Sequence, residues 1–277
     1  MNKRIAICLY GLVGQAKTWK DGGYVSLDSQ EIVKEVANRW KIRCKYDGEV
    51  DFYIHSWDEG YEDELRALYK PKNLKTEKQI QFNVWPRLFL EFKKIKGFRK
   101  RCKFLYNIYF SYPKHKQLYW KKRIFAALSR WYSTAESLKM CQEYSDRSGH
   151  TYDYVISARL DLVLLNDLNI SQLDPQKLNL AHFNRTPNST MGIEADKSNL
   201  TNNEDKLSDL IFISNMNIMY HLIDIYQNFD NYAINPHVAA YEAFSKAISR
   251  KDFNYFIFPW IEFSTVKAHF YSWKLGF

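Results

Sequence analysis

Two oppositely charged residues, Arg159 and Asp161, end an aromatic and β-branched run that covers residues 152–162. Alternate residues of an extended chain point to the same side of it. In α/β proteins, ligands bind in the crevice outside the carboxyl ends of the strands. A charge at the end of a buried strand needs a charged partner or a ligand, because an unpaired buried charge is unstable. This pair is therefore the first candidate for chemistry in the chain.

Two kinds of chemistry suit this pair. An arginine can hold a phosphate group through two parallel hydrogen bonds and without a metal. An aspartate can bind a hard divalent cation such as Mg²⁺ or Mn²⁺, or accept a hydrogen bond from a sugar or ribose hydroxyl. The simpler alternative is a salt bridge between Arg159 and Asp161. The sequence favours ligand binding and leaves metal dependence open.

The first seventy residues predict the elements that position such a site. An apolar run at residues 5–10 ends at Gly11, which indicates a buried strand followed by a loop. The loop contains Gly14 and allows close backbone approach to a ligand, although it matches neither a dinucleotide nor a P-loop fingerprint. A helix beginning at Asp28 or Ser29, a strand at 50–57 and an acidic helix at 58–69 follow. This alternation predicts a parallel sheet with crossover helices.

The remaining elements are predicted in the same way. Pro86 lies inside a helical pattern at 79–96, which it should kink or begin. Further patterns predict helices at 118–148, 215–229 and 236–250, and strands at 152–162, 178–183, 209–214 and 253–258. The predicted fold class is α/β, with a Rossmann-type, mixed but mostly parallel sheet between helices. We expect one domain over residues 1–277, with a basic and aromatic helical insertion at about 86–123.

Much of the formal charge of +9 is concentrated in the basic segment 93–123, where Lys and Arg alternate with aromatic residues. Such a segment can bind nucleic acid, lie on an anionic membrane, or form a solvated helical face. No nucleic-acid-binding motif accompanies it. The sequence therefore favours peripheral contact with an anionic membrane over contact with nucleic acid.

Composition narrows the class of protein. Hydrophobic residues make up 46% and charged residues 26% of the 277 residues, which is ordinary for a globular protein. The four cysteines lack metal or redox spacing, which is typical of reduced thiols in a cytosolic protein. No apolar run is long enough to span a bilayer. We expect a cytoplasmic location, with possible peripheral contact at the inner face of the membrane.

Three short motifs occur together in this order: residues 6–11 (Ala-Ile-Cys-Leu-Tyr-Gly), 55–57 (His-Ser-Trp) and 159–161 (Arg-Leu-Asp). Together with residues 209–214 and Met219, they resemble a bacterial family of surface-polysaccharide glycosyltransferases. The resemblance covers most of the chain, and it implies a GT-A-like fold and a nucleotide-sugar donor.

Within that resemblance, Gly11 and Gly14 are expected beside the nucleotide and Arg159 on the diphosphate. Asp161 would position a divalent metal or the donor sugar. Asp209 is the candidate catalytic base, with a cap of the following strand as the alternative. His55 could contact the nucleotide or be a hydrogen-bonded core histidine, and His237 could face the leaving phosphate or only begin a helix.

The sequence thus predicts a glycosyltransferase that moves a sugar from a nucleotide-sugar donor to a capsule or lipopolysaccharide acceptor, which is a glycan or lipid-linked glycan. One alternative is a phosphoryl- or sulfuryl-group transferase that acts on such a glycan. The other is a non-catalytic glycan-binding subunit.

Overall fold

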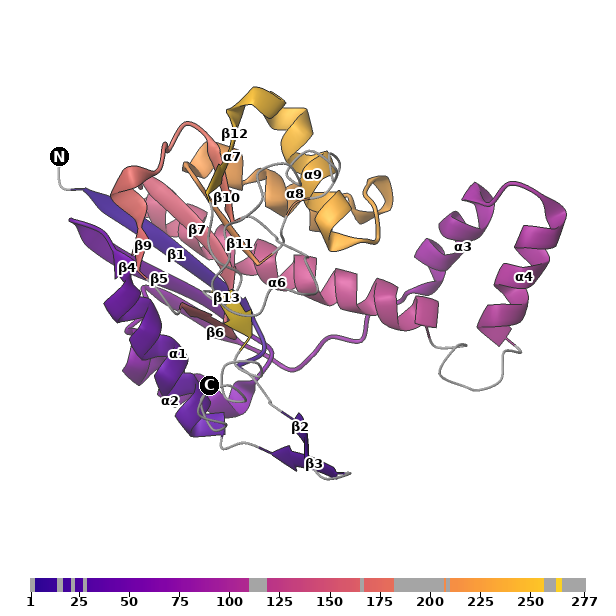
Figure 1. Cartoon of the computed structure of the whole chain (residues 1–277), viewed down its shortest axis with the longest axis horizontal. Helices are drawn as coiled ribbons and strands as arrows, with labels where there is room; N and C mark the ends of the chain where they lie inside the picture. The colour runs from indigo at the N-terminus through magenta and orange to yellow at the C-terminus, as the bar shows by residue number, and fades with distance from the viewer. Residues whose placement is uncertain are drawn as a thin grey trace.

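A seven-stranded sheet forms the centre of the protein (Figure 1). The computed structural model describes residues 3–13, 17–20, 23–26, 29–109, 119–164, 167–181, 207, 210–256 and 263–265. Across the sheet the strands follow the order β12, β10, β11, β7, β1, β5 and β6. Their bounds are β1 Arg4–Gly11, β5 Glu49–Ser56, β6 Asn73–Thr76, β7 Tyr154–Arg159, β10 Leu178–Ala181, β11 Ile211–Ser214 and β12 Phe253–Phe256.

Six of these strands run in one direction. The pairings β1–β5, β1–β7, β5–β6 and β10–β12 are parallel, whereas β11 runs antiparallel to both of its neighbours. The predicted mixed, mostly parallel α/β sheet is therefore confirmed.

Strand β1 is the central element, because it pairs along its length with both β5 and β7. Tyr10 lies opposite His55 on one side and Arg159 on the other. The carboxyl ends of the three strands consequently meet at one edge of the sheet. The near-continuous apolar sequence of β1 fits a strand covered on both faces.

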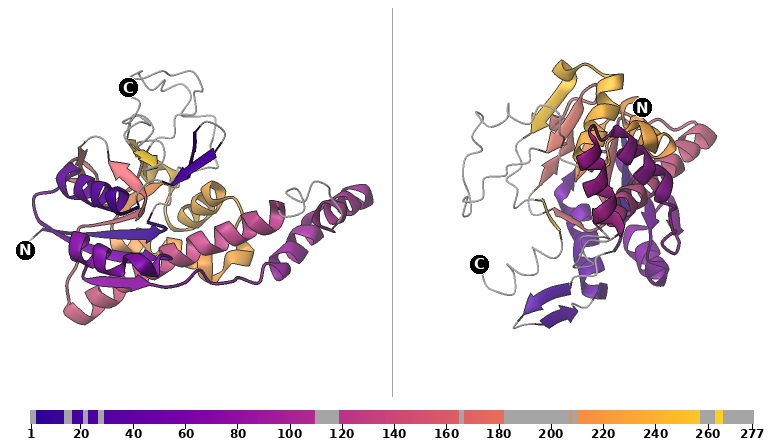
Figure 2. Two further views of the ribbon diagram at one scale, coloured as in Figure 1. Left: turned by 90° about the horizontal axis from the view of Figure 1, so that it is seen from below. Right: turned by 90° about the vertical axis from the view of Figure 1, so that its right-hand side faces the viewer.

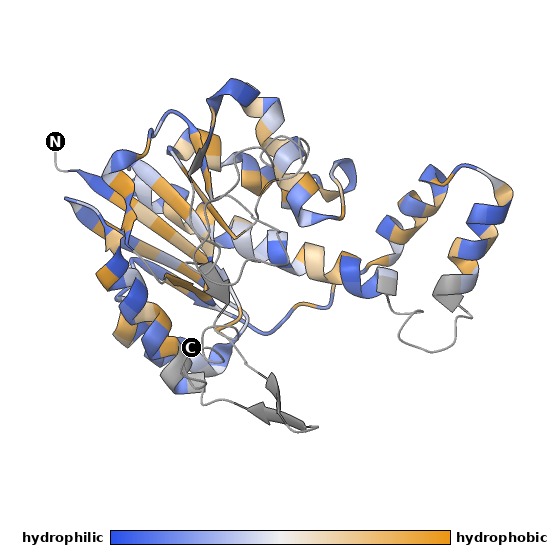
Figure 3. Ribbon diagram, in the orientation of Figure 1, coloured by the Kyte–Doolittle hydropathy of each residue, from blue (hydrophilic) through white to orange (hydrophobic). Residues whose placement is uncertain are grey.

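Helices cover both faces of the sheet (Figures 1 and 2). Helices α1 (Ser29–Arg43) and α2 (Glu62–Tyr69) pack on the face that buries Ile5, Ile7 and Leu9. Helices α6 (Tyr119–Ser148), α8 (His221–Gln227) and α9 (Pro236–Ala247) pack on the opposite face, against Ala6 and Cys8. The apolar strands and the inner helix faces form the two cores, visible as orange bands in Figure 3.

Helix α6 connects the core with the outer part of the molecule. Between Ile124 and Leu138 its buried apolar residues recur every three or four positions, which is the period of one helix face: Ile124, Ala127, Trp131, Ala135 and Leu138. This 30-residue helix confirms the predicted helix at 118–148. Its first turns lie beside α3 (Trp85–Lys94) and α4 (Phe98–Tyr109), which project from the domain as a helical hairpin (Figure 1).

Some elements differ from the predicted ones. The helix predicted at 79–96 begins only at Trp85, with Pro86 in its first turn, where the missing N–H of proline costs nothing. The helix predicted at 215–229 is divided into α7 (Met216–Met219) and α8. Sequence patterns did not indicate β6, at the sheet edge, or three two-stranded pairs outside the main sheet. These pairs are β2 (Lys17–Lys20) with β3 (Gly23–Ser26), β4 (Cys44–Lys45) with β9 (Leu168–Asn169), and β8 (Leu162–Leu164) with β13 (Phe263–Thr265).

Arg87 fixes the projecting hairpin to the domain. Its side chain is almost fully buried, and it donates hydrogen bonds to the carbonyls of Phe229 (2.7 Å) and Tyr232 (2.5 Å). The Glu91 carboxylate lies 3.0 Å from the same guanidinium. One buried cation therefore joins α3 to the turn after α8.

We expect Arg87→Ala to lower the free energy of unfolding by about 3 kcal/mol, because it leaves two buried carbonyls without their hydrogen-bond donor and removes one of the two cations at Glu91. Urea unfolding of the variant, compared with Arg99→Ala on the exposed surface of α4, measures the effect. A change within about 0.5 kcal/mol of wild type, the range of ordinary surface substitutions, would contradict this anchoring role.

Candidate functional site

A pocket of about 550 Å³ opens at the carboxyl ends of β1 and β7, beside helix α6. From β1 the chain continues to β5, which pairs with one edge of β1, whereas β7 pairs with the other edge of β1. The pocket is therefore at the point where the strand order reverses. In open α/β sheets this crevice is the usual ligand-binding position.

Strand alternation directs Tyr10 and Arg159 to the α6 face of the sheet. Cys8 and Ala6 face the α6 core, and the alternation of side chains places Tyr10 on the same face. Arg130 of α6 donates a hydrogen bond to the Tyr10 hydroxyl (2.8 Å), and its guanidinium lies 5.6 Å from the Tyr10 ring centroid. This contact joins α6 to the end of β1 across the pocket.

Arg159 and Asp161 line the pocket together and form a bidentate salt bridge. The Arg159 Nε donates to one carboxylate oxygen of Asp161 at 2.8 Å, and Nη2 donates to the other at 2.5 Å. The intervening Leu160 N–H donates to the Tyr10 carbonyl (2.8 Å), which fixes the turn to the end of β1. The salt bridge that the sequence allowed is formed, and it borders a cavity large enough for a ligand; a ligand-binding role remains a prediction.

Positive charge dominates this pocket. Three guanidinium groups, from Arg123, Arg130 and Arg159, line it, against the single carboxylate of Asp161 among the described lining residues. The Arg159 side chain is 36% exposed and the Asp161 side chain 18% exposed. A concave, partly apolar site with an excess of cations attracts anionic ligands.

The loop after β1 is held close to this pocket. Gly11 lines it and has φ +109°, a region that favours glycine. The Gly11 carbonyl accepts a hydrogen bond from Trp57 N–H (3.2 Å), and the Asp58 carboxylate accepts one from Val13 N–H (2.7 Å). Gly14 lies outside the described residues.

His55 is not among the residues that line the pocket, and its side chain is fully buried. Because a carboxylate only accepts, Nε2 donates to Glu77 (3.0 Å) and Nδ1 accepts from the Ser133 hydroxyl (2.6 Å). Both ring nitrogens are thus used within the protein. These contacts are those of a hydrogen-bonded core histidine, which the sequence offered as the alternative to contact with the nucleotide.

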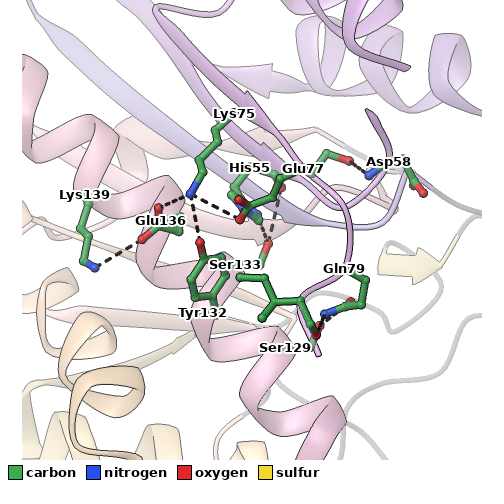
Figure 4. A network of polar contacts seen from close by, with 12 residues as sticks. His55, Asp58, Lys75, Glu77, Gln79, Ser129, Tyr132, Ser133, Glu136 and Lys139 are labelled. Atoms are coloured by element: carbon green, nitrogen blue, oxygen red, sulfur yellow. Dashed lines mark hydrogen bonds and ion pairs between the residues drawn. The ribbon is translucent and has the colours of Figure 1, made fainter. Parts of the chain in front are cut away.

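His55 belongs to a polar network between the β5–β6 edge and α6 (Figure 4). Lys75 lies at its centre and donates to the Tyr132 hydroxyl (3.0 Å) and the Glu136 carboxylate (2.8 Å). Lys75 also lies 3.3 Å from Glu77, and the Trp57 ring stacks on Tyr132. The network orients Trp57, whose side chain lines the pocket.

Burial lowers the pKa of His55 below its ordinary value of 6.5, against the opposing effect of Glu77. The folded protein therefore binds this proton less readily than the unfolded chain. The stability that neutral His55 contributes is present above pH 6.5 and is lost as the pH falls below that value.

We accordingly expect the free energy of unfolding to decrease between pH 7.5 and 5.5, and the decrease to be smaller in His55→Gln, which cannot take up this proton. Urea unfolding at several pH values measures it. Gln81→Ala, which replaces an exposed side chain that does not titrate, is the control and should retain the wild-type pH dependence. Identical pH dependence in His55→Gln and wild type would contradict this role.

His237 lies at the start of α9, and the structure does not bring it into the pocket. Its N–H donates to the side chain of Asn235 (3.0 Å), and its Nδ1 lies 2.8 Å from the Leu207 carbonyl oxygen. Its neighbour Pro236 lines the pocket instead. Asp209, the predicted base, lies outside the described residues.

The described residues do not assemble a metal centre. They contain no group of three or more His, Cys, Asp or Glu side chains that could hold a metal ion. Both oxygens of Asp161 accept hydrogen bonds from Arg159, and no second carboxylate is among the described lining residues.

No known protein family matches the chain, and no curated protein is significantly similar to it. No helix in the described ranges has the length and apolarity needed to cross a bilayer.

Sequence reasoning did not select Arg123 and Arg130. They lie seven positions apart on one side of α6, and the sequence pattern placed Arg123 in the basic segment 93–123 and not at this site. That spacing is a usable signal, because two cations two turns apart on a helix can face one site. Gln79, Ser129 and Phe125, which also line the pocket, carried no comparable signal.

Proposed function

We propose that this protein is a nucleotide-sugar-dependent glycosyltransferase with a GT-A-like fold, which transfers a sugar to a capsule or lipopolysaccharide acceptor. The observation that carries the proposal is the pocket at the reversal point of the strand order, where three arginines face one aspartate. The order of the short motifs along the chain supports the same class of enzyme.

A sugar nucleotide contains two phosphates. Transfer of its sugar releases a nucleoside diphosphate, which carries additional negative charge. Guanidinium groups bind phosphate oxygens through paired, charge-assisted hydrogen bonds. Arg159 is the main ligand in this proposal, with Arg130 and Arg123 contributing from α6. They stabilise the diphosphate most when it leaves, which is the interaction that accelerates transfer.

The uncharged wall of the pocket suits the nucleoside and the sugar. Trp57, Tyr10 and Phe125 line it with aromatic surface, and the loop at Gly11 lets backbone approach the ligand. Sites for small molecules combine such apolar walls with a few polar groups that set the orientation.

Asp161 is a positioning residue in this proposal. Its two carboxylate oxygens hold the Arg159 guanidinium in one plane at the carboxyl end of β7. The acceptor hydroxyl must lose a proton as the new glycosidic bond forms, and Asp209 is the proposed base. Its carboxylate would have to reach that hydroxyl within about 3.2 Å.

A second, smaller pocket suits the acceptor side. It has a volume of about 250 Å³, and Phe125 lines both pockets. Its other lining residues are Phe82, Val84, Lys121 and Lys122. We place the acceptor glycan here, because its hydroxyl would then enter the main pocket past Phe125.

Thermal unfolding with a panel of nucleoside diphosphates, each with Mn²⁺ or with EDTA, tests the proposal. At a ligand concentration of 100 Kd, binding should stabilise the protein by about 2.7 kcal/mol. We expect one diphosphate to raise the melting temperature in EDTA as well as in Mn²⁺, and the corresponding sugar nucleotide to be hydrolysed or transferred with nucleotide release.

Two other outcomes would favour the alternatives. Stabilisation by a polysaccharide, with no response to any nucleotide, would indicate a glycan-binding subunit. Stabilisation by a nucleoside bisphosphate or triphosphate in preference to every diphosphate would indicate a sulfuryl- or phosphoryl-group transferase.

A further inference from the structure

The helical hairpin of α3 and α4 holds most of the excess charge of the protein. Residues 85–109 contain eight Lys or Arg and one acidic residue, Glu91, which gives a formal charge of +7 out of the total of +9. The other residues contain 32 basic and 30 acidic side chains and are almost neutral in sum. The hairpin projects from the domain in two perpendicular views (Figures 1 and 2).

The same hairpin exposes large apolar side chains. Five of the eight exposed large hydrophobic residues in the described part of the chain lie on it: Trp85 (47% exposed), Phe89 (57%), Phe98 (81%), Leu105 (39%) and Tyr106 (56%). Phe98 is the most exposed of all and begins α4, directly after the turn. Exposed apolar side chains gathered on one projection indicate an interaction surface.

Cations and aromatic rings are neighbours on this surface. The Lys93 ammonium lies 4.4 Å from the Phe89 ring centroid, and the Lys121 ammonium lies 4.2 Å from that of Trp85. Figure 3 shows the resulting mixture of hydrophilic and hydrophobic residues along both helices. A partner must therefore satisfy positive charge and apolar surface within one contact area.

Contacts between α3 and α4 hold the hairpin together. Phe92 and Phe104 pack between the helices, and Arg101 of α4 donates to the Ile95 carbonyl at the end of α3 (2.9 Å). Arg87 then fixes α3 to the domain. The exposed side chains are therefore carried by two helices that are packed on each other and joined to the domain.

We propose that the α3–α4 hairpin docks on the surface of an anionic lipid bilayer. Lys and Arg side chains contact lipid phosphates, while Phe89, Phe98 and their aromatic neighbours enter the headgroup region. The combination of one sign of charge with exposed Phe, Trp and Leu matches this surface. A nucleic acid would match the charge but would leave Phe98, at the start of α4, and Leu105, within α4, without apolar partners.

Docking in this way would place the second pocket at the membrane side of the main pocket. Val84 and Lys121, which line the second pocket, lie at the base of the hairpin. A lipid-linked acceptor would then reach the site from the bilayer. This last step rests on the proposed function, whereas binding of the hairpin to lipid does not.

Vesicle flotation of the full chain, without nucleotide, tests the proposal. The vesicles contain phosphatidylcholine alone or phosphatidylcholine with 30% phosphatidylglycerol. We expect binding to the anionic vesicles to be at least about tenfold stronger, and to fall in 0.5 M salt. Equal binding to both vesicles, or no binding to either, would overturn the proposal.

Two sets of substitutions assign the binding to the hairpin. The charge variant combines Lys93→Gln, Lys94→Gln, Arg99→Gln and Lys100→Gln, and the apolar variant combines Phe89→Ser and Phe98→Ser. The matched control combines Lys34→Gln, Lys41→Gln, Lys45→Gln and Lys78→Gln, which removes the same charge from exposed sites outside the hairpin. Circular dichroism confirms that each variant is folded.

The charge variant should lose at least about tenfold in vesicle binding and the apolar variant several-fold, whereas the control should stay within about twofold of wild type. An equal loss of vesicle binding in the control would show that binding depends only on the net charge of the protein, and it would overturn the proposal. Loss of oligonucleotide binding in the charge variant, without vesicle binding by wild type, would assign the hairpin to nucleic acid. Arg159→Ala should bind vesicles normally, so failure of the nucleotide site and failure of the membrane site are distinguishable.

Discussion

Arg159→Ala is expected to weaken binding of the nucleoside diphosphate by about 10- to 100-fold and to abolish detectable sugar transfer. The N–H of Nε and one N–H of Nη2 hold Asp161, and the guanidinium has further N–H groups on Nη1 and Nη2 that we assign to the diphosphate at the end of β7. Hydrogen bonds to charged groups contribute about 1.5–3 kcal/mol each, and 1.4 kcal/mol corresponds to about tenfold in affinity. Isothermal titration calorimetry measures binding, and nucleotide release measures transfer.

Arg66→Ala is the matched control for this variant. Arg66 also holds a carboxylate through Nε and Nη2, that of Glu62, but it lies on the exposed face of α2. Its removal should leave binding and transfer within about twofold of wild type, because an exposed ion pair contributes little. An equal reduction in both variants would point to a general loss of stability instead of a lost phosphate ligand.

Asp161→Asn is expected to lower kcat by about 100-fold while weakening diphosphate binding less than tenfold. The amide can accept only one of the two Arg159 hydrogen bonds, so the guanidinium remains present but loses its fixed plane. Misplacement of a catalytic group by about 1 Å can cost that factor in rate. Steady-state kinetics separate kcat from KM.

Two measurements complete this test. Asp167→Asn, which alters an exposed carboxylate 3.5 Å from Arg43, should leave kcat unchanged. Diphosphate binding by Asp161→Asn should be the same in Mn²⁺ and in EDTA. If wild type required Mn²⁺ for binding and the variant lost that requirement, Asp161 would be a metal ligand and its assignment as a positioning residue would be wrong.

Local patterns were sufficient to predict the elements that hold the site. The apolar runs before Gly11 and Arg159 form β1 and β7, and the helical period from Ile124 to Leu138 forms α6. Parallel pairing then places the ends of β1 and β7 at one edge, because strands separated by crossover helices run in the same direction. The position of Arg159 and Asp161 beside a pocket follows from these local signals.

Contacts between distant segments could not be predicted in the same way. Arg130 reaches Tyr10 across 120 positions of sequence, and His55 reaches Ser133 across 78. The sequence allowed two interpretations of His55. The contact with Ser133 of α6 distinguishes them, and this contact depends on tertiary packing. Strand β6 has four residues and a polar sequence, so its place at the sheet edge comes from pairing with β5 and not from a hydrophobic pattern.

A crystal structure with the nucleoside diphosphate selected by thermal unfolding tests the central claim most directly. We expect the diphosphate at the carboxyl ends of β1 and β7, with phosphate oxygens about 2.7–3.2 Å from the Arg159 guanidinium nitrogens. The nucleoside should lie against the aromatic wall that includes Trp57. A nucleotide bound elsewhere, with Arg159 distant from both phosphates, would contradict it.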